Sequence, residues 1–571
     1  MEDTPNPEFI STAGGNGWSL PKRAFGTRSH SEEDDEITVL VEGVIYSESP
    51  VDLESVLRRA FAAKDSAGTV KIIQHFQERT DGEFVVAAEH RATGQRVLFN
   101  DQFGRLPLFW ATHRIDGRLI IGRSASAVAR ASGCQLPHRP GIAARLLFGY
   151  PLDDGTEYAG VTSVPEATLV RMPNSAATPE CSHGAVGYGL GIQGRDVKRR
   201  DPIIAALGEA LITACRRRAT RMHRLVPTIA LSGGFDSRLV ACAMHAAGLE
   251  FETMTRSDHL AEQGDPHVAR QVATLLSVAH REIQTGPIDT ELLLDLVRST
   301  EGALGTPLAH MLGFLINVKR DYGADRFLLT GDGGDKTVAP LLPPGNIRAR
   351  TEMRRLYTSI ADKDRRTVLS LLNMSEQDFS SYCEEAFLSQ PGTTAAEKAR
   401  ALVFRQRARR WLSVAEDRNR SVFWSTTPFY SPEFMELTNE ITDAAKQRDR
   451  LYLALLDWFE PRLARLPRPG RGRHSPVDSL MLEAYLQLSR SPLLTSAYRR
   501  LKRNPQPKQE QLNVMDLLRL AQQKGGGIWT LCDPDELLNS IATATGRPWQ
   551  QRLVSLALRN LALAPAMTAD D

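Results

Sequence analysis

Residues 231–238 read Leu231-Ser232-Gly233-Gly234-Phe235-Asp236-Ser237-Arg238, and this stretch decides the fold of the chain. The apolar residues 226–231 predict a buried parallel strand, and residues 239–244 predict the first turns of a helix. Glycines in such a turn let backbone N–H groups approach an oxyanion, and the helix dipole favours negative charge there. The stretch therefore predicts an anion cradle; the alternative is an ordinary turn in which a serine caps the helix.

The aspartate of this stretch limits what the cradle can bind. Asp236 cannot bind phosphate directly, because both groups are negative. It is suited to magnesium, which takes carboxylates together with phosphate oxygens. The Walker phosphate loop is excluded, because it needs four residues between its glycines and then Gly-Lys-Ser/Thr. We therefore predict a phosphate site that works through a magnesium-binding aspartate.

A second strand runs into a glycine-rich turn at residues 326–336, which read Arg326-Phe327-Leu328-Leu329-Thr330-Gly331-Asp332-Gly333-Gly334-Asp335-Lys336. Two such turns, each with an aspartate, are more specific than either alone. Strands alternate with helices between the two turns, which predicts an α/β fold with a doubly wound parallel sheet. Ligands of such sheets lie at the carboxyl ends of the strands. The alternative is two turns in which the aspartates only cap helices.

The first stretch resembles the Ser-Gly-Gly-x-Asp-Ser pyrophosphate loop of ATP pyrophosphatases. With its surroundings it is similar to the asparagine synthetase family, which includes β-lactam synthetases and lasso-peptide cyclases, over most of residues 35–475. The resemblance implies ATP and Mg²⁺ as cofactors, with Asp236 and Asp335 holding the metal. It places the following residues against ATP: Leu231, Ser232, Gly233, Gly234, Asp236, Ser237, Met254, Thr330 and Gly331.

The resemblance also implies catalytic residues, with departures. Asp332 falls where asparagine synthetases carry a catalytic glutamate, and Lys336 replaces an acid of the family. Arg471 lies where related enzymes place a catalytic lysine, and it would stabilise pyrophosphate or a developing oxyanion; a solvated surface loop is an equal alternative. Residues 416–420 are similar to the Asp-Arg run that lines the acyl-substrate pocket, but residues 425–427 lack the Glu-Ala-Arg of asparagine synthetases.

The strand-rich segment 37–165 is similar to the glutaminase domain of class II amidotransferases, through residues 42–46, 81–84 and 100–108. That domain needs an amino-terminal cysteine thiolate to attack glutamine. Here the chain begins Met1-Glu2-Asp3, and Asp81 replaces an asparagine that helps to hold the oxyanion. We predict a glutaminase-like domain of stacked antiparallel sheets that has lost glutamine hydrolysis and supports the second domain.

The predicted organisation has five parts. They are a flexible arm (1–36), the glutaminase-like domain (37–165), a linker or crossing segment (166–200), an ATP-pyrophosphatase domain (201–475) and a helical carboxyl-terminal extension (476–571). A net charge of +2 makes no case for nucleic acid as a partner, and no apolar run approaches the length of a membrane helix. Six scattered cysteines without a CxxC pair, and no signal peptide, predict a cytoplasmic enzyme. A homodimer is left open.

The predicted function is an ATP-dependent amide ligase that releases AMP and pyrophosphate. A carboxylate would be adenylated and captured by an amine that does not come from glutamine. One alternative is an intramolecular cyclase of the lasso-peptide or β-lactam synthetase type, in which acid and amine belong to one substrate. Another is a non-catalytic regulatory protein that binds ATP. The sequence does not identify the acid or the amine.

Overall fold

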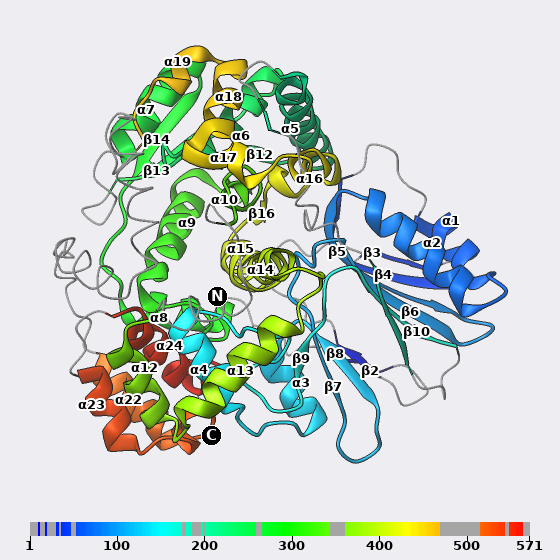
Figure 1. Ribbon diagram of the computed structural model, residues 1–571, viewed down its shortest axis with the longest axis vertical. Coiled ribbons are helices and arrows are strands. Elements are labelled where there is room, and N and C mark those ends of the chain that lie inside the picture. Colours follow the sequence, from blue (N-terminus) through cyan, green and yellow to red (C-terminus); the bar gives the residue numbers. More distant parts are fainter. Residues whose placement is uncertain are drawn as a thin grey trace.

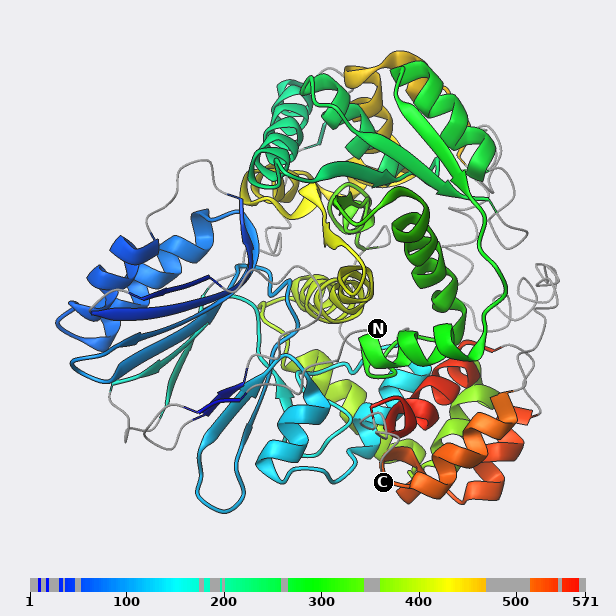
Figure 2. The ribbon, with the colours of Figure 1, turned by 180° about the vertical axis from the view of Figure 1, so that it is seen from behind.

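The computed structural model places three groups of elements around a central helix (Figure 1 and, from behind, Figure 2). They are an antiparallel β-rich part near the amino terminus, a parallel-sheet part, and a helical group that contains the last helices. The structure describes residues 9–11, 17–19, 30–33, 36–46, 53–173, 179–184, 196–197, 201–257, 265–342, 360–468, 514–542 and 547–563.

The amino-terminal part contains a six-stranded antiparallel sheet in the order β11-β10-β6-β5-β4-β3. Its strands are β3 (His30–Glu33), β4 (Ile37–Ile45), β5 (Gly82–His90), β6 (Gln95–Asn100), β10 (Thr168–Met172) and β11 (Glu180–His183). Helices α1 (Leu53–Phe61) and α2 (Ser66–Arg79) cover one face (Figure 1). Alternating apolar residues of the strands form a core with both helices, which fixes the register of the sheet.

A second, five-stranded sheet completes this part in the order β1-β2-β8-β7-β9. Its strands are β1 (Phe9–Ser11), β2 (Gly17–Ser19), β7 (Phe109–Thr112), β8 (Leu119–Gly122) and β9 (Thr162–Ser163). Helix α3 (Ala125–Ser132) contacts β7 and β8. The predicted α/β class with an antiparallel amino-terminal part is confirmed.

Two sequence predictions differ from these sheets. Strands β1, β2 and β3 fall within residues 1–36, which we expected to be a flexible arm, and β10 and β11 fall within the expected linker 166–200. These strands are three to five residues long. Backbone hydrogen bonds to neighbouring strands hold them in the sheets, and segments this short have too little apolar alternation to be recognised in the sequence.

The third sheet has five strands, and every neighbouring pair is parallel, in the order β14-β13-β12-β15-β16. The strands are β12 (Val226–Ala230), β13 (Glu252–Arg256), β14 (Ala279–Ile283), β15 (Arg326–Leu329) and β16 (Trp424–Thr426). Counted along the chain this order is 3-2-1-4-5, so the direction of winding reverses between β12 and β15. The doubly wound sheet predicted from the sequence is confirmed.

Helices lie on the faces of this sheet (Figure 2). They are α5 (Pro202–Arg221), α6 (Phe235–Ala246), α7 (Asp265–Leu276), α9 (Ala309–Tyr322), α18 (Arg450–Phe459) and α19 (Pro461–Ala464). Helix α8 (Thr290–Thr300) lies away from the sheet and contacts α24 (Pro548–Ala562) (Figure 1). Helix α18 packs against α5 and α6, and the largest apolar cluster of the protein extends from there to the amino-terminal sheets. The two parts therefore share one core.

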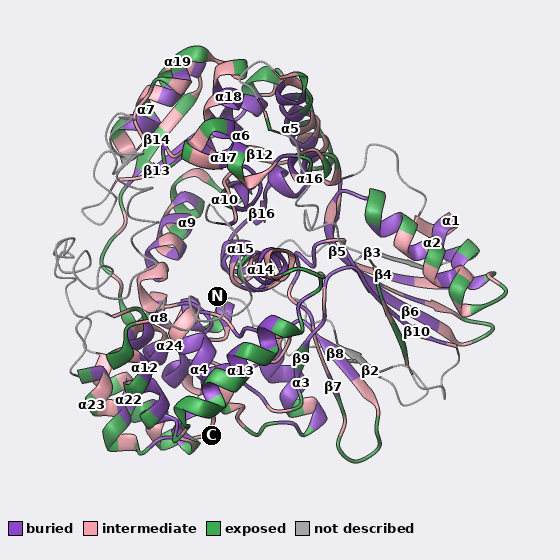
Figure 3. Cartoon of the chain, viewed as in Figure 1, coloured by how far each residue is buried: buried purple, intermediate pink, exposed green. Residues whose placement is uncertain are grey.

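Helix α15 (Ser413–Arg420) occupies the centre of the molecule, and Figure 3 shows it buried on all sides. Helix α14 (Ala395–Leu402) and a π-helical segment (Val403–Leu412) lead into it. Polar or charged residues make up most of α15, yet all of Ser413, Glu416, Asp417, Arg418, Asn419 and Arg420 are buried. Such burial is stable only if the charges are paired.

The helical group consists of α4 (Arg139–Phe148), α12 (Asp362–Leu371), α13 (Glu376–Leu388), α22 (Val514–Lys524), α23 (Pro534–Ala542) and α24 (Pro548–Ala562). One apolar cluster joins them, and α24 contacts both α4 and α8. The described end of the chain is thus tied to both of the other parts. In the part of the chain that the structure describes, no helix has the length and apolar character needed to cross a bilayer.

Candidate active site

The two glycine-rich turns lie side by side at the carboxyl edge of the parallel sheet. Strands β12 and β15 are hydrogen-bonded neighbours, with Ile229 opposite Leu329 at their ends. The turns that follow them therefore leave the sheet at the point where its winding reverses. In open α/β sheets this point is where ligands bind.

The first turn is organised by its serines. The backbone N–H of Ser232 donates to the Ser237 hydroxyl at 3.2 Å, and that of Gly234 donates to the Ser232 hydroxyl at 3.3 Å. Gly233 has a positive φ of 73°, and a Cβ there would lie 2.9 Å from Cβ of Val268. A glycine is therefore required at this position, and α6 begins immediately after the turn.

The second turn packs directly on the first. A Cβ atom at Gly331 would lie 2.6 Å from the backbone nitrogen of Ser237, and one at Gly334 would lie 2.3 Å from Oδ1 of Asp236. Both glycines are needed because any side chain would separate the turns. The close approach brings Asp236, Asp332 and Asp335 into one site, as the sequence predicts.

Asp236 is half-buried and accepts a hydrogen bond from the hydroxyl of Tyr452, on α18. Burial raises the pKa of Asp236 to about 7; the Tyr452 hydrogen bond and Arg468 act against this rise, and Asp335 and Asp332 add to it. Asp236 thus lies in a field of negative charge that favours a bound cation. Tyr452 is a site residue that sequence reasoning missed, because nothing in its own segment distinguishes it from other aromatic core residues.

The other two aspartates differ in their partners. Asp335 is about half exposed and forms an ion pair with the buried Lys336. Asp332 is not part of any ion pair in the described residues, and burial raises its pKa, an effect that the charges of Arg418 and Arg105 oppose. Asp332 is therefore held by the longer-range charges of these arginines and not by a direct ion pair among the described residues.

A magnesium ion fits this arrangement only together with a phosphate ligand. Among the residues that the structure describes, no three carboxylate, histidine or cysteine side chains form a set that could hold a metal alone. Magnesium, however, is usually held by one or two carboxylates plus phosphate oxygens. Asp236 and Asp335, on facing turns, supply that partial set.

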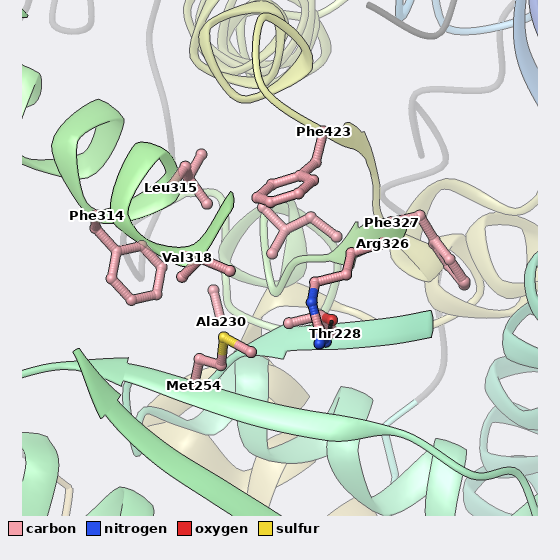
Figure 4. A pocket seen from close by; sticks show the side chains of 10 residues that line it. Thr228, Ala230, Met254, Phe314, Leu315, Val318, Arg326, Phe327 and Phe423 are labelled. Atoms are coloured by element: carbon pink, nitrogen blue, oxygen red, sulfur yellow. Dashed lines mark hydrogen bonds between the residues drawn. The ribbon is translucent and has the colours of Figure 1, made fainter. Parts of the chain in front are cut away.

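The remaining predicted residues have different positions. Thr330 is tied to the neighbouring strand, since its backbone N–H donates to the carbonyl of Thr426 at 2.9 Å. The Met254 side chain is 1% exposed and lines a small apolar cavity beneath the sheet (Figure 4). Met254 is linked to the first turn through its backbone, because its carbonyl accepts a hydrogen bond from the N–H of Leu231 at 2.8 Å. Arg471 lies outside the described residues.

Arg238, the last residue of the 231–238 stretch, fixes another segment against the first turn. Its guanidinium is fully buried and donates to four carbonyls, those of Gly233 (2.6 Å), Leu463 (2.8 Å), Pro467 (2.9 Å) and Leu466 (3.3 Å). The segment after α19, which leads to the predicted catalytic loop, is thereby clamped to the phosphate turn. The following Arg468 places its guanidinium 5.4 Å from the Phe235 ring centre.

We expect Arg238→Met to destabilise the protein by about 2–4 kcal/mol, because buried carbonyls would lose their donors. The affinity for a non-hydrolysable ATP analogue should fall with it, since the clamped segment borders the turn. Thermal unfolding and calorimetric titration measure the two effects. Arg224→Met, at an exposed position, is the control. A variant with the stability and affinity of the wild type would show that the clamp is dispensable.

The domain interface closes over the predicted remnant of the glutaminase site. Asp81 is paired through both carboxylate oxygens with Arg218 of α5, at 2.8 and 3.0 Å, and both side chains are 1% exposed. Arg218 also lies 4.4 Å from the Tyr46 ring centre and donates to Thr426 at 2.9 Å. Glu83 accepts from Tyr46 (2.7 Å) and Thr426 (2.8 Å). Both carboxylate oxygens of Asp81 therefore bind Arg218 of the second domain.

A second buried network joins the amino-terminal part to α15. Arg123 pairs with Glu42 at 2.8 Å and Asp417 at 3.0 Å, and Arg105 pairs with Glu416. Arg420 pairs with the same two acids of α15 and donates to backbone carbonyls. The charges of α15 are thus balanced by arginines of the amino-terminal part, with Arg105 also acting on Asp332.

Comparisons with a family model, with curated sequences and with solved structures each give matches. Residues 206–469 match the asparagine synthase family model. The chain is 28% identical over 339 residues to carboxyethyl-arginine β-lactam synthase of Streptomyces clavuligerus, covering 57% of this chain and 58% of that relative's length. A solved structure of NMN synthetase from Francisella tularensis covers 37% of this chain and 93% of its own, at 12% identity and a TM-score of 0.19, too low to show a shared fold.

Proposed function

We propose that the protein is an ATP-dependent ligase that adenylates a carboxylate and transfers the acyl group to an amine. The match of residues 206–469 to the asparagine synthase family model supports this proposal. The observation that carries the proposal is the meeting of two glycine turns and three aspartates at the switch point of the sheet. A nucleoside triphosphate and a divalent cation suit this site, because backbone N–H groups bind phosphate and carboxylates bind the cation.

The reaction has two steps. A carboxylate oxygen attacks the α-phosphorus of ATP, the bond to pyrophosphate breaks, and an acyl-adenylate forms. An amine nitrogen then attacks the acyl carbon, loses a proton, and AMP leaves. Bound magnesium would neutralise phosphate charge, held by Asp236 and Asp335. The chain's own contribution is to orient the phosphates on the turns and to keep Asp332 and Arg418 beside the reacting groups, since positioning and charge supply most of such catalysis.

The amine is proposed to come from a source other than glutamine. Asp81, which would have to help hold the oxyanion, is ionically paired with Arg218 and is 2% exposed. An anion at this position is a poor oxyanion donor. All six cysteines are free, and every one except Cys181 of β11 is buried. Burial raises the pKa of Cys215 and Cys242 to about 12, whereas a reactive cysteine needs a low pKa to form its thiolate.

An intramolecular amide is the second candidate. It is favoured by the relative whose name states that it makes a β-lactam, because a lactam joins the acid and the amine of one molecule. Residues 425–427 are fully buried in the domain interface, where Thr426 contacts Glu83 and Arg218. These residues are therefore engaged with the protein itself and do not offer a pocket for a free amino acid.

We expect the purified protein to release pyrophosphate from ATP and magnesium only when an acid substrate is present. The test is a pyrophosphate assay with pools of amino acids, N-carboxyalkyl amino acids and short peptides, with ammonia or hydroxylamine as the amine. Glutamine should not replace either amine. A substrate that needs no added amine would identify the intramolecular case.

Two results would contradict the proposal. Absence of both ATP binding and pyrophosphate release would contradict any ATP-dependent activity, whereas ATP binding without release would favour the regulatory protein that binds ATP. Release of ammonia from glutamine at the rate of product formation would show that the amino-terminal part hydrolyses glutamine after all. A boiled sample and a reaction without acid serve as controls.

A further inference from the structure

The two carboxylates proposed to hold magnesium are each engaged by a donor of the chain itself. Asp236 accepts from the Tyr452 hydroxyl, and Asp335 is paired with the ammonium group of Lys336. Only the second partner is a cation. The place next to Asp335 that a metal ion would take is therefore filled by a positive charge of the protein.

Lys336 is unusual in how deeply it lies. Its side chain is 6% exposed, whereas that of Asp335 is 48% exposed. Lysine is almost never buried unless it is paired, because its ammonium group is strongly hydrated. The charges of Asp335 and Asp236 both act on it. The lysine thus faces inward, toward the pair of carboxylates, and not toward solvent.

A nearby buried lysine shows the structural alternative. Lys446 is 2% exposed and donates to the backbone carbonyl of Thr337 at 2.8 Å, at the other end of the short helix α10 (Gly334–Thr337). A carbonyl partner of this kind holds two segments together. Lys336 instead has a half-exposed carboxylate as its partner, which a ligand from solvent can reach.

Asp236, Asp332 and Asp335 do not form a complete metal site by themselves. Their combined negative charge would still give a divalent cation some affinity for the site without nucleotide. Asp236, Asp332 and Asp335 lie close enough for the charges of Asp332 and Asp335 to act on Asp236. A resident ammonium group removes part of that attraction, because it neutralises one carboxylate. When triphosphate arrives, it brings more negative charge than the lysine alone can balance, and a metal ion then becomes favourable.

We infer that Lys336 is a phosphate-binding residue that neutralises Asp335 in the free protein and moves to a phosphate oxygen when nucleotide and magnesium enter together. The inference rests on the proposed function, because it takes ATP as the ligand. Metal and nucleotide then bind as one unit. The free protein has only weak affinity for divalent cations, and part of its affinity for nucleotide does not depend on metal.

The first test measures binding of Mn²⁺ without nucleotide by electron paramagnetic resonance. Lys336→Met frees Asp335 and should tighten the Kd for Mn²⁺ at least about tenfold relative to the wild type. Lys336→Arg keeps the cation and should bind as weakly as the wild type. Lys336→Met with Asp335→Asn should lose the gain, which would place the metal on Asp335. A wild-type protein that binds Mn²⁺ as tightly as Lys336→Met would overturn the inference.

The second test measures binding of α,β-methylene-ATP by calorimetry without metal. Lys336→Met should weaken it at least about tenfold, and Lys336→Arg should weaken it less. Equal binding by all three proteins would overturn the phosphate role. Failure of the wild type to bind the magnesium-loaded analogue would instead sink the proposed function, while the Mn²⁺ experiment still decides whether Lys336 blocks a metal. Circular dichroism and thermal unfolding check that each variant is folded.

Discussion

Asp236→Asn should lower pyrophosphate release on the order of 10²–10³-fold while the protein remains folded, because the amide cannot neutralise or hold a cation as a carboxylate does. The substitution keeps the shape that Gly331 and Gly334 pack against. Burial makes the Asp236 carboxylate costly in the free protein, with its pKa at about 7, so an uncharged amide should not reduce stability. The measurement is the steady-state rate with the acid substrate found in the assay, together with the melting temperature.

The matched control is Asp321→Asn. Asp321 is exposed at the end of α9 and pairs with its neighbour Arg320. It belongs to neither of the two glycine-rich turns. It should keep the activity of the wild type. If Asp236→Asn retained more than a tenth of the activity, the role of Asp236 at the phosphates would be refuted, whatever the effect on stability.

Arg218→Met should have the largest effect on stability, a loss of about 3–5 kcal/mol, because it leaves Asp81 buried without its countercharge. Asp81 and Arg218 are both 1% exposed, so solvent cannot replace the lost partner. Replacing both, with Asp81→Leu added to Arg218→Met, should recover most of the loss. Chemical unfolding followed by tryptophan fluorescence reports on the interface, since Trp424 donates to Tyr46 there at 2.7 Å.

Arg221→Met is the comparison for this cycle, since Arg221 is exposed on the same helix. Its loss should stay within about 0.5 kcal/mol. Equal losses in Arg218→Met and Arg221→Met would mean that the interface does not depend on the ion pair. If the double replacement were as unstable as the single one, the loss would come from packing and not from the unpaired carboxylate.

The parts of the site that the sequence predicts are those encoded locally. Each turn with its strand, its glycines and its aspartate occupies about ten consecutive residues, so spacing alone indicates the chemistry. That both turns lie at one edge of the sheet follows as well, because parallel strands of such a sheet end at the same edge. The alternation of strands and helices predicts the fold class, whereas the order that places β12 beside β15 comes from the structure.

The parts that the sequence does not predict are contacts between distant residues. Tyr452 and Asp236 are 216 positions apart, and Arg218 and Asp81 are 137 apart. The resemblance places residues 416–420 at an acyl-substrate pocket, but their own sequence does not show where their counterions come from. Arg123 and Arg105 of the amino-terminal part supply them, and this pairing allows the run to be buried. Such pairings depend on how the domains pack together, and the hydrophobic periodicity of a single segment does not indicate them.

The position of α24 has a consequence for how the protein is made. This helix completes the apolar cluster that begins with α4, yet the two are separated by roughly 400 residues of chain. At about 5–20 residues per second, α4 leaves the ribosome roughly 20–80 s before its partner is synthesised. During that time α12 and α13 are made and pack against α4, but the part of its apolar face that α24 covers remains open. Nascent chains of this protein should therefore depend on chaperones late in synthesis, and a stop codon shortly before residue 548 should yield an aggregating product although the whole candidate site is already present.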